Sequence, residues 1–105
     1  MFLSVIIPCY NEASRGSGDK SLESRLEQIL SYFGQYSYEL HFVDDGSTDN
    51  SIREILDFIN KHGVTNWAVV KSDKNHGKGH AIHTGIQIAN GDYCLIMDAD
   101  LSTSL

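Results

Sequence analysis

Along the chain, short apolar runs typical of strands alternate with stretches in which apolar residues recur at helical spacing. Short apolar runs at residues 2–7, 38–43, 67–70 and 93–97 predict four strands. Between them, apolar residues recur at helical spacing and predict three helices. The three apolar stripes comprise Leu22, Leu26, Ile29, Leu30 and Phe33, then Ile52, Ile55, Leu56 and Ile59, and finally Ala81, Ile82, Gly85, Ile86 and Ala89. The chain is therefore expected to alternate strand and helix from end to end.

This alternation predicts an α/β fold. Strands joined by helices of about a dozen residues imply right-handed crossovers and a mostly parallel sheet with helices on both faces, as in Rossmann-like folds. The runs at 38–43 and 93–97 are almost continuously apolar, which is typical of strands covered on both sides. No linker, repeat or low-complexity segment divides the chain, so we expect a single domain over residues 1–105.

Composition narrows the class of protein. With 14 acidic and 8 basic residues, the formal net charge is −6, which argues against nucleic acid as a partner. No apolar run reaches the roughly 18–20 residues of a membrane span, and the amino terminus lacks the basic flank of a signal peptide. Cys9 and Cys94 show no metal or redox spacing and each adjoins an apolar run. We expect buried free thiols and a cytoplasmic location.

Polar segments follow every predicted strand. They are residues 8–12 (PCYNE), 44–47 (DDGS), 75–79 (NHGKG) and 98–100 (DAD). In open parallel sheets, ligands bind beyond the carboxyl ends of the strands, so these segments are the candidate site. Their carboxylates would repel one another unless a cation or hydrogen-bond donors offset the charge. Asp49 has a purely structural explanation as a helix cap, but such an explanation fits poorly for Asp44, Asp45, Asp98 and Asp100 taken together.

Asp98 and Asp100 are the candidate metal ligands. In an extended chain, residues two apart leave the same side of the backbone, about 6–7 Å apart. Carboxylate oxygens suit a hard divalent ion such as Mg²⁺ or Mn²⁺, whose remaining ligands would be water and substrate phosphate. An Asp-x-Asp pattern is common by chance, and its position after a buried strand is what strengthens it here.

Lys78 has two open interpretations. The surrounding turn matches neither a Walker loop nor a dinucleotide fingerprint, although it lies where a helix amino terminus favours anions. Lys78 either meets a phosphate or ribose, or is a solvated residue in a tight turn.

Other candidate residues have simpler explanations. His76, His80 and His83 lack a zinc signature, so surface or helix-capping roles are favoured over a metal site. Tyr10 either joins the core or stacks on a base. No positioned base accompanies Cys9, so packing is favoured over nucleophilic catalysis.

Four blocks of the sequence carry a family resemblance. Residues 4–12, 42–49, 75–79 and 97–101 resemble the nucleotide-sugar half of family-two GT-A glycosyltransferases, in the order that the family has them. Within that family, the DADL form and the NHGKG turn look most like the polyprenyl-phosphate sugar transferases. The stretch 25–32 is also similar to the dolichyl-phosphate glucosyltransferase branch.

The resemblance implies an enzyme and a site. The implied reaction is metal-dependent transfer of a sugar, with inversion, from a nucleoside-diphosphate sugar, with a polyprenyl phosphate as acceptor. A UDP-sugar is favoured over a GDP-sugar by frequency in the family. Asp45 would accept a hydrogen bond from a ring N–H of the base. The implied nucleotide-binding residues are Pro8, Tyr10, Glu12, Val43, Asp45, Lys78, Asp98 and Ala99, and the implied metal ligands are Asp98 and Asp100.

The resemblance also implies a departure in extent. Family domains continue well past the Asp-x-Asp strand, and the later region supplies the acceptor site and the catalytic carboxylate. We therefore expect a truncated chain that binds the donor weakly without turnover, with its catalytic residues beyond Leu105 and an exposed sheet edge that favours a homodimer. In a full-length form we expect a place at the cytoplasmic membrane face.

Two other functions remain open at this point. One is a non-catalytic nucleotide-binding remnant or interaction module on the same fold. The other is a receiver-like phosphoacceptor domain, although its acidic pair would follow the first strand rather than the second.

Overall fold

The described part of the chain forms a four-stranded parallel sheet with three α-helices. The structure is a computed structural model that describes residues 2–15, 18, 21–72 and 74–99. In chain order the elements are β1 (Leu3–Cys9), the 3₁₀ turn η1 (Glu12–Ser14), α1 (Leu22–Phe33), β2 (Tyr38–Asp44), α2 (Ser51–His62), β3 (Trp67–Lys71), α3 (Lys78–Ile88) and β4 (Tyr93–Ile96). The strand order is β3-β2-β1-β4 and every pairing is parallel. The predicted α/β fold is confirmed, and η1 is an element that was not predicted.

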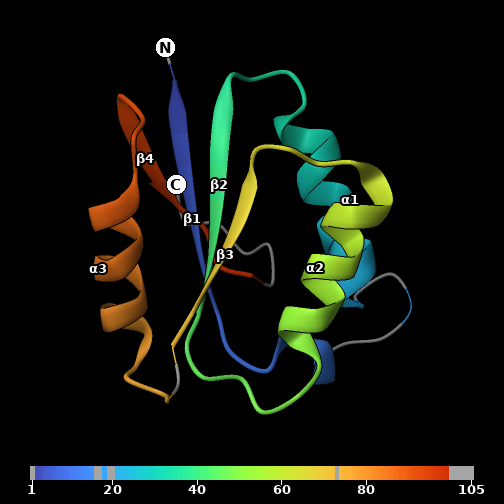
Figure 1. The fold of residues 1–105 in the computed structure, drawn as a ribbon. Coiled ribbons are helices and arrows are strands. Elements are labelled where there is room, and N and C mark those ends of the chain that lie inside the picture. Colours follow the sequence, from blue (N-terminus) through green and yellow to red (C-terminus); the bar gives the residue numbers. More distant parts are fainter. Residues whose placement is uncertain (1, 16–17, 19–20, 73, 100–105) are drawn as a thin grey trace.

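The helices lie on both faces of the sheet because successive strands are not all added in the same direction. It first steps outward from β1 to β2 to β3, and then returns past β1 to β4. Crossovers of one hand therefore place α1 and α2 on one face and α3 on the other, as Figure 1 shows. All four strands point the same way, downward in Figure 1, so their carboxyl ends share one edge, and the order in which strands are added changes direction between β1 and β4. That switch point is where ligands enter open α/β sheets.

Strand β1 continues two residues beyond the predicted stop and includes Pro8. The Met97 amide donates to the Ile6 carbonyl at 3.0 Å, so backbone groups of Ile6 face β4. Pro8 is two residues on and faces the same side, but the β4 pairing has already ended at Ile96. Since no ladder bond is needed there, a proline without an N–H is tolerated inside a central strand.

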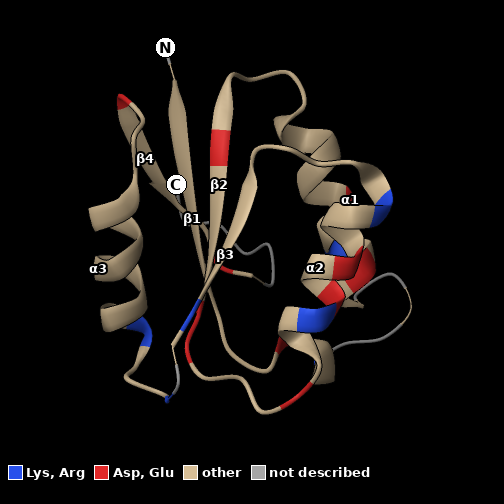
Figure 2. Cartoon of the chain, in the orientation of Figure 1, with Lys and Arg blue, Asp and Glu red and all other residues tan. Residues whose placement is uncertain are grey.

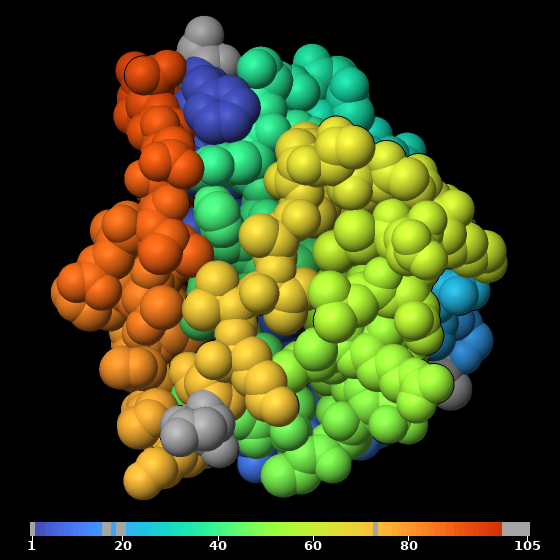
Figure 3. Space-filling model, in the orientation of Figure 1, coloured from blue at the N-terminus to red at the C-terminus, as the bar shows by residue number. Residues whose placement is uncertain are grey.

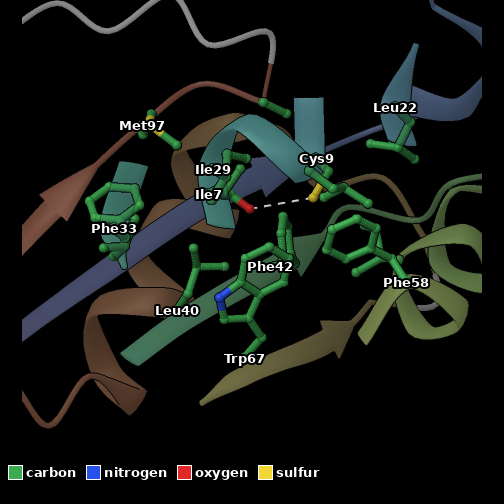
Figure 4. Close-up of a cluster of buried hydrophobic side chains, with 14 of the residues drawn as sticks. Ile7, Cys9, Leu22, Ile29, Phe33, Leu40, Phe42, Phe58, Trp67 and Met97 are labelled. Atoms are coloured by element: carbon green, nitrogen blue, oxygen red, sulfur yellow. Dashed lines mark hydrogen bonds between the residues drawn. The ribbon is translucent and has the colours of Figure 1, made fainter. Parts of the chain in front are cut away.

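The larger core lies between the sheet and α1 and α2. The stripe of α1 was predicted correctly and packs on Ile7, Leu40 and Phe42 of the two central strands (Figure 4). Ser21 caps this helix, accepting a hydrogen bond from the Ser24 amide at 3.2 Å. A smaller hydrophobic cluster packs α3 against the opposite face of the sheet.

The stripe of α2 differs from the prediction. Ile55 is buried as expected, but Leu56 is 49% exposed and Phe58 takes the inward place. Phe58 stacks on Trp67 of β3 with ring centroids 5.6 Å apart. The apolar residues of α2 fit more than one helix face, and the prediction chose the face that includes Leu56. Only the contact with β3 shows which face is buried.

Both sheet edges remain open within the described residues. β3 lies exposed between α2 and α3 (Figure 3), and β4 has no further strand beside it in the part of the chain described. Cys94 on β4 is exposed, so the expectation of two buried thiols is correct for Cys9 and wrong for Cys94. The homodimer through the β4 edge stays a prediction. No helix in the described ranges has the length and apolar character needed to cross a membrane.

A polar network connects the strands at the amino-terminal end of the sheet. Glu39 Oε2 accepts hydrogen bonds from the Ser4 hydroxyl and the Asn90 amide, each at 2.6 Å, and lies 3.2 Å from His41 Nε2. Burial alone would raise the pKa of Glu39, but the hydrogen bonds from Ser4, Asn90 and His41 outweigh it and lower the pKa to about 2. The carboxylate is therefore the form that the fold requires.

Glu39 makes the stability of the fold pH-dependent. Its pKa in the folded chain, about 2, lies below its ordinary value of 4.5, so its contribution is complete above pH 4.5 and is lost as the pH falls toward 2. We expect Glu39→Gln to lower the free energy of unfolding by about 1–2 kcal/mol at pH 6. The difference from the parent should shrink toward pH 2. Urea unfolding at several pH values measures this, with the exposed Glu54→Gln as control, and pH-independent differences would contradict it.

Candidate functional site

A cleft of about 400 Å³ lies at the carboxyl edge of the sheet. Acidic and basic positions both occur along this lower edge in Figure 2. The cleft spans the switch point between β1 and β4, where the fold predicts a ligand. Its lining residues are Pro8, Cys9, Tyr10, Glu12, Arg15, Asp45, Asn75, Gly77, Lys78, Ala81, Asp98 and Ala99.

The segment after β1 is held against the segment after β2. Asn11 adopts a left-handed conformation with φ 53°, and its Oδ1 accepts the Thr48 amide at 2.8 Å. Asp49 accepts the Ser14 amide at 2.9 Å through one oxygen and the Ser51 amide at 2.9 Å through the other. The N-cap position of α2 is Asn50 rather than the expected Asp49, but Asp49 still binds the first amide of the helix and also anchors η1.

Asp44 does not face the cleft. It is fully buried, and its carboxylate accepts the amide and the hydroxyl of Ser47 at 2.8 and 2.5 Å. Asp44 belongs to the set of aspartates that, from the sequence, a structural role explains poorly as a set, but for Asp44 by itself a structural role fits. Asp44 closes its own turn, which is the usual local role of an aspartate before Gly-Ser.

Asp45 connects β2 to the loop that precedes α3. Its Oδ1 accepts the His76 amide and its Oδ2 accepts the Gly77 amide, both at 2.8 Å. The side chain is 5% exposed and lines the cleft. Its charge is therefore offset by two backbone donors, and the same bonds hold the start of α3 at the rim.

Lys78 and Asp98 form an ion pair across the cleft. Lys78 Nζ lies 2.5 Å from Asp98 Oδ1, and the two side chains are 59% and 38% exposed. The position of Lys78 in the first turn of α3, rather than in a preceding turn, directs it toward the end of β4. Asp98 is thus already the partner of a cation at the switch point.

The donor chemistry at Asp98 fits a hard divalent ion. The carboxylate supplies oxygen, is partly open to solvent and lines the cleft. Asp100 lies outside the described residues. Within those residues no group of three or more His, Cys, Asp or Glu side chains is arranged to hold a metal. The rings of His76 and His80 pack with centroids 4.6 Å apart.

The structure brings almost all of the predicted nucleotide-binding residues to one place. Pro8, Tyr10, Glu12, Asp45, Lys78, Asp98 and Ala99 all line the cleft. Val43 does not, because its side chain is fully buried with Ile6 and Ala81 in the small cluster under α3.

Cys9 lines the cleft, but its environment does not favour a reactive thiolate. Burial raises the pKa of its thiol far above the ordinary range, and Asp44 and Glu12 add to the effect. The thiol donates to the Ile7 carbonyl (Figure 4). The sequence-based choice of packing over catalysis agrees with this environment.

Two residues at or beneath the cleft were not proposed from the sequence. Arg15 lines it, and Arg25 lies under it at 5% exposure. A signal for Arg25 was present, since it falls three residues after Leu22 and four before Ile29, inside the apolar stripe of α1. A charge in such a stripe indicates a buried partner.

Comparison with known proteins identifies relatives along nearly the whole chain. Residues 4–104 match the family model described as glycosyl transferase family 2. A dolichyl-phosphate beta-glucosyltransferase from Dictyostelium discoideum is 36% identical over 110 residues, covering 98% of this chain and 32% of that protein. An undecaprenyl-phosphate 4-deoxy-4-formamido-L-arabinose transferase from Proteus mirabilis is 37% identical, covering 94% of this chain and 29% of that protein. The chain thus spans about a third of the length of these curated relatives.

Solved structures with the same fold hold nucleotides. A mannosyltransferase from Pyrobaculum calidifontis, in complex with GDP-Man and Mn²⁺, superimposes with a TM-score of 0.78 and 31% identity, covering 93% of this chain and 27% of that one. TarS from S. aureus, in complex with UDP, has a TM-score of 0.74 and 28% identity, covering 95% of this chain and 28% of that one. Divalent metal and both kinds of nucleotide therefore occur among proteins similar to this chain.

Proposed function

The chain belongs to glycosyl transferase family 2, and on that premise we propose that it carries the donor-binding site of a sugar transferase that acts on a polyprenyl phosphate. The relatives named for dolichyl and undecaprenyl phosphate support this acceptor class. Family membership also removes the receiver-domain alternative. Because the chain spans about a third of those relatives, we propose that residues 1–105 are the nucleotide-sugar part of a larger catalytic unit.

The pairing of Asp98 with Lys78 at the switch point is the observation that carries the proposal. A carboxylate and an ammonium group lie together at the mouth of a cleft that also contains Tyr10 and Asp45. A nucleoside diphosphate offers a flat base, hydrogen-bonding ring atoms and an anionic diphosphate. The cleft supplies an aromatic ring, a buried acceptor and a site for cations in matching chemistry.

Each predicted residue has a place in this proposal. Tyr10, Pro8 and Glu12 would surround the base and ribose from the segment after β1. Asp45 would accept a ring N–H, since a carboxylate has capacity beyond the two amides that it already binds. The buried side chain of Val43 leaves its main chain as the part that would meet the base.

The diphosphate would lie at the other end of the cleft. Asp98 and Asp100 would hold Mg²⁺ or Mn²⁺, and a divalent ion neutralises charge on a diphosphate leaving group. Lys78 would exchange part of its contact with Asp98 for a phosphate oxygen and add a second positive charge. Ala99 would contact ribose or phosphate from between the two aspartates. We propose UDP ahead of GDP as the nucleotide, and a membrane face as the working place of the full-length protein.

Nucleotide binding with and without metal tests the proposal. We expect calorimetry to detect UDP or GDP binding by the 105-residue chain that strengthens when Mn²⁺ or Mg²⁺ is added. Asp98→Asn keeps the size of the side chain but removes its charge, and should weaken the metal-dependent binding by about 10- to 100-fold. The measurement is the dissociation constant for each nucleotide in the presence and absence of metal.

Asp57→Asn is the matched control. Asp57 is exposed on α2 and does not line the cleft, so its variant should bind like the parent. If metal fails to strengthen nucleotide binding by the parent chain, or if both asparagine variants bind like the parent, the proposed donor site is wrong.

A further inference from the structure

Arg25 is a buried cation beneath the cleft. It lies on α1 at 5% exposure, with apolar neighbours such as Leu22, Leu26 and Phe42 around it. An arginine in such a place is costly unless its donors are satisfied. The hydrogen-bond acceptors around Arg25 therefore indicate its role.

The guanidinium group of Arg25 joins the two loops that form the cleft. Its Nη1 donates to Glu12 Oε1 at 2.9 Å and to the Ala99 carbonyl at 2.8 Å. Its Nη2 donates to the Glu12 carbonyl at 2.9 Å and to the Arg15 carbonyl at 3.3 Å. One rigid fork thus holds the segment after β1 and the segment after β4 at a fixed separation.

These acceptors are themselves parts of the site. Glu12 and Ala99 line the cleft on one side and the small space around Arg25 on the other. Ala99 directly follows Asp98 in the sequence, so a hydrogen bond to its carbonyl restrains the backbone next to that carboxylate. Arg25 itself lies outside the cleft lining.

Lysine cannot reproduce this arrangement. Its single ammonium group is a point charge, whereas the planar guanidinium presents donors in fixed directions to acceptors on two segments. Arg25→Lys therefore keeps the charge in the core and removes the bridge between the loops.

We propose that Arg25 is a positioning residue that couples the nucleotide-facing loop after β1 to the metal-facing loop after β4. The inference rests on the proposed donor site. A divalent ion that orders Asp98 orders Ala99 and, through Arg25, Glu12 and η1. The nucleotide acts in the reverse direction, because coupling between two ligands is reciprocal. Metal and nucleotide then strengthen each other's binding through the protein as well as through the diphosphate.

The test compares Arg25→Lys with the parent in a binding cycle. Calorimetry measures UDP and GDP binding with and without Mn²⁺, and the ratio of the two dissociation constants is the gain due to metal. We expect Arg25→Lys to reduce that gain by about 10- to 100-fold, the usual effect of losing a residue that orients metal ligands. Arg53→Lys makes the same change at an exposed position on α2 and should leave the gain unchanged.

Hydrogen exchange on the unaltered chain gives a second measurement that does not depend on how the variant folds. Mn²⁺ alone should slow exchange of the Arg15 amide, which donates to the Glu12 carbonyl in η1, although η1 carries no proposed metal ligand. No change in that amide would overturn the inference.

The outcomes separate the two proposals. If the parent shows the metal-dependent gain and Arg25→Lys shows the same gain, the coupling role is wrong while the donor site stands. Equal weakening with and without Mn²⁺ means that Arg25 only supports the fold, and it also overturns the inference. If the parent shows no metal-dependent nucleotide binding, the proposed function fails first.

Discussion

Gly46→Ala is expected to lower the free energy of unfolding by about 2–5 kcal/mol. Gly46 has φ +77°, and a Cβ there would lie 2.6 Å from the Lys74 carbonyl carbon and 2.7 Å from the Asn75 nitrogen. Both are backbone atoms, so the clash is relieved only by moving the loop that precedes α3. The measurement is the urea-unfolding midpoint together with nucleotide affinity, which should fall because that loop delivers Lys78 to the cleft.

Gly63→Ala separates backbone strain from the clash. Gly63 ends α2 with φ +62°, close to the conformation of Gly46, but nothing lies within 4 Å of a Cβ built there. It should cost only about 1 kcal/mol, the penalty for a left-handed alanine. Equal losses in the two variants would show that contact with the 74–75 backbone contributes nothing.

The sequence predicted the layers of the fold because the apolar periods and the turn residues agree with each other. The stripe of α1 is the clearest case, because the residues that cap the helix in the structure, Ser21 and Gly34, directly flank the predicted apolar period. The stripe of α2 was less determinate, because Leu56 and Phe58 are both apolar and only Trp67 decides which one is covered. A local pattern does not predict which residues, far apart in the sequence, pack together across a sheet.

The site was predictable as a location and less so as a set of roles. Polar segments after parallel strands meet at one edge whatever their partners, so the cleft could be anticipated. Asp44 and Asp45 are adjacent and chemically identical, yet one is buried in its own turn and the other binds the 76–77 backbone. Alternation of side chains along a strand separates them, and only the neighbouring loop assigns the function.

The exposure of Cys94 has the same kind of cause. An apolar run predicts burial on the assumption that both faces and both edges are covered. β4 is the last strand of the described sheet, and Tyr93 beside it is 63% exposed. Local hydrophobicity reports the environment that a strand is suited to, rather than the neighbours that it has in this chain.

Asp45→Asn should remove much of the same loop anchorage by a different route. The two amides of His76 and Gly77 each bind a separate carboxylate oxygen at 2.8 Å. Asparagine has one oxygen and one NH₂ group, so one of the two amides would face another donor, unsatisfied at 5% exposure. We expect a loss of about 2–4 kcal/mol in the free energy of unfolding, from one missing bond to a charged acceptor and one buried unpaired donor. Urea unfolding measures the loss, and hydrogen exchange should show faster exchange at His76 or Gly77 but not in α1. The exposed Asp57→Asn is the control, and a difference below about 0.5 kcal/mol between the two variants would contradict the anchoring role, since surface substitutions usually fall within that range.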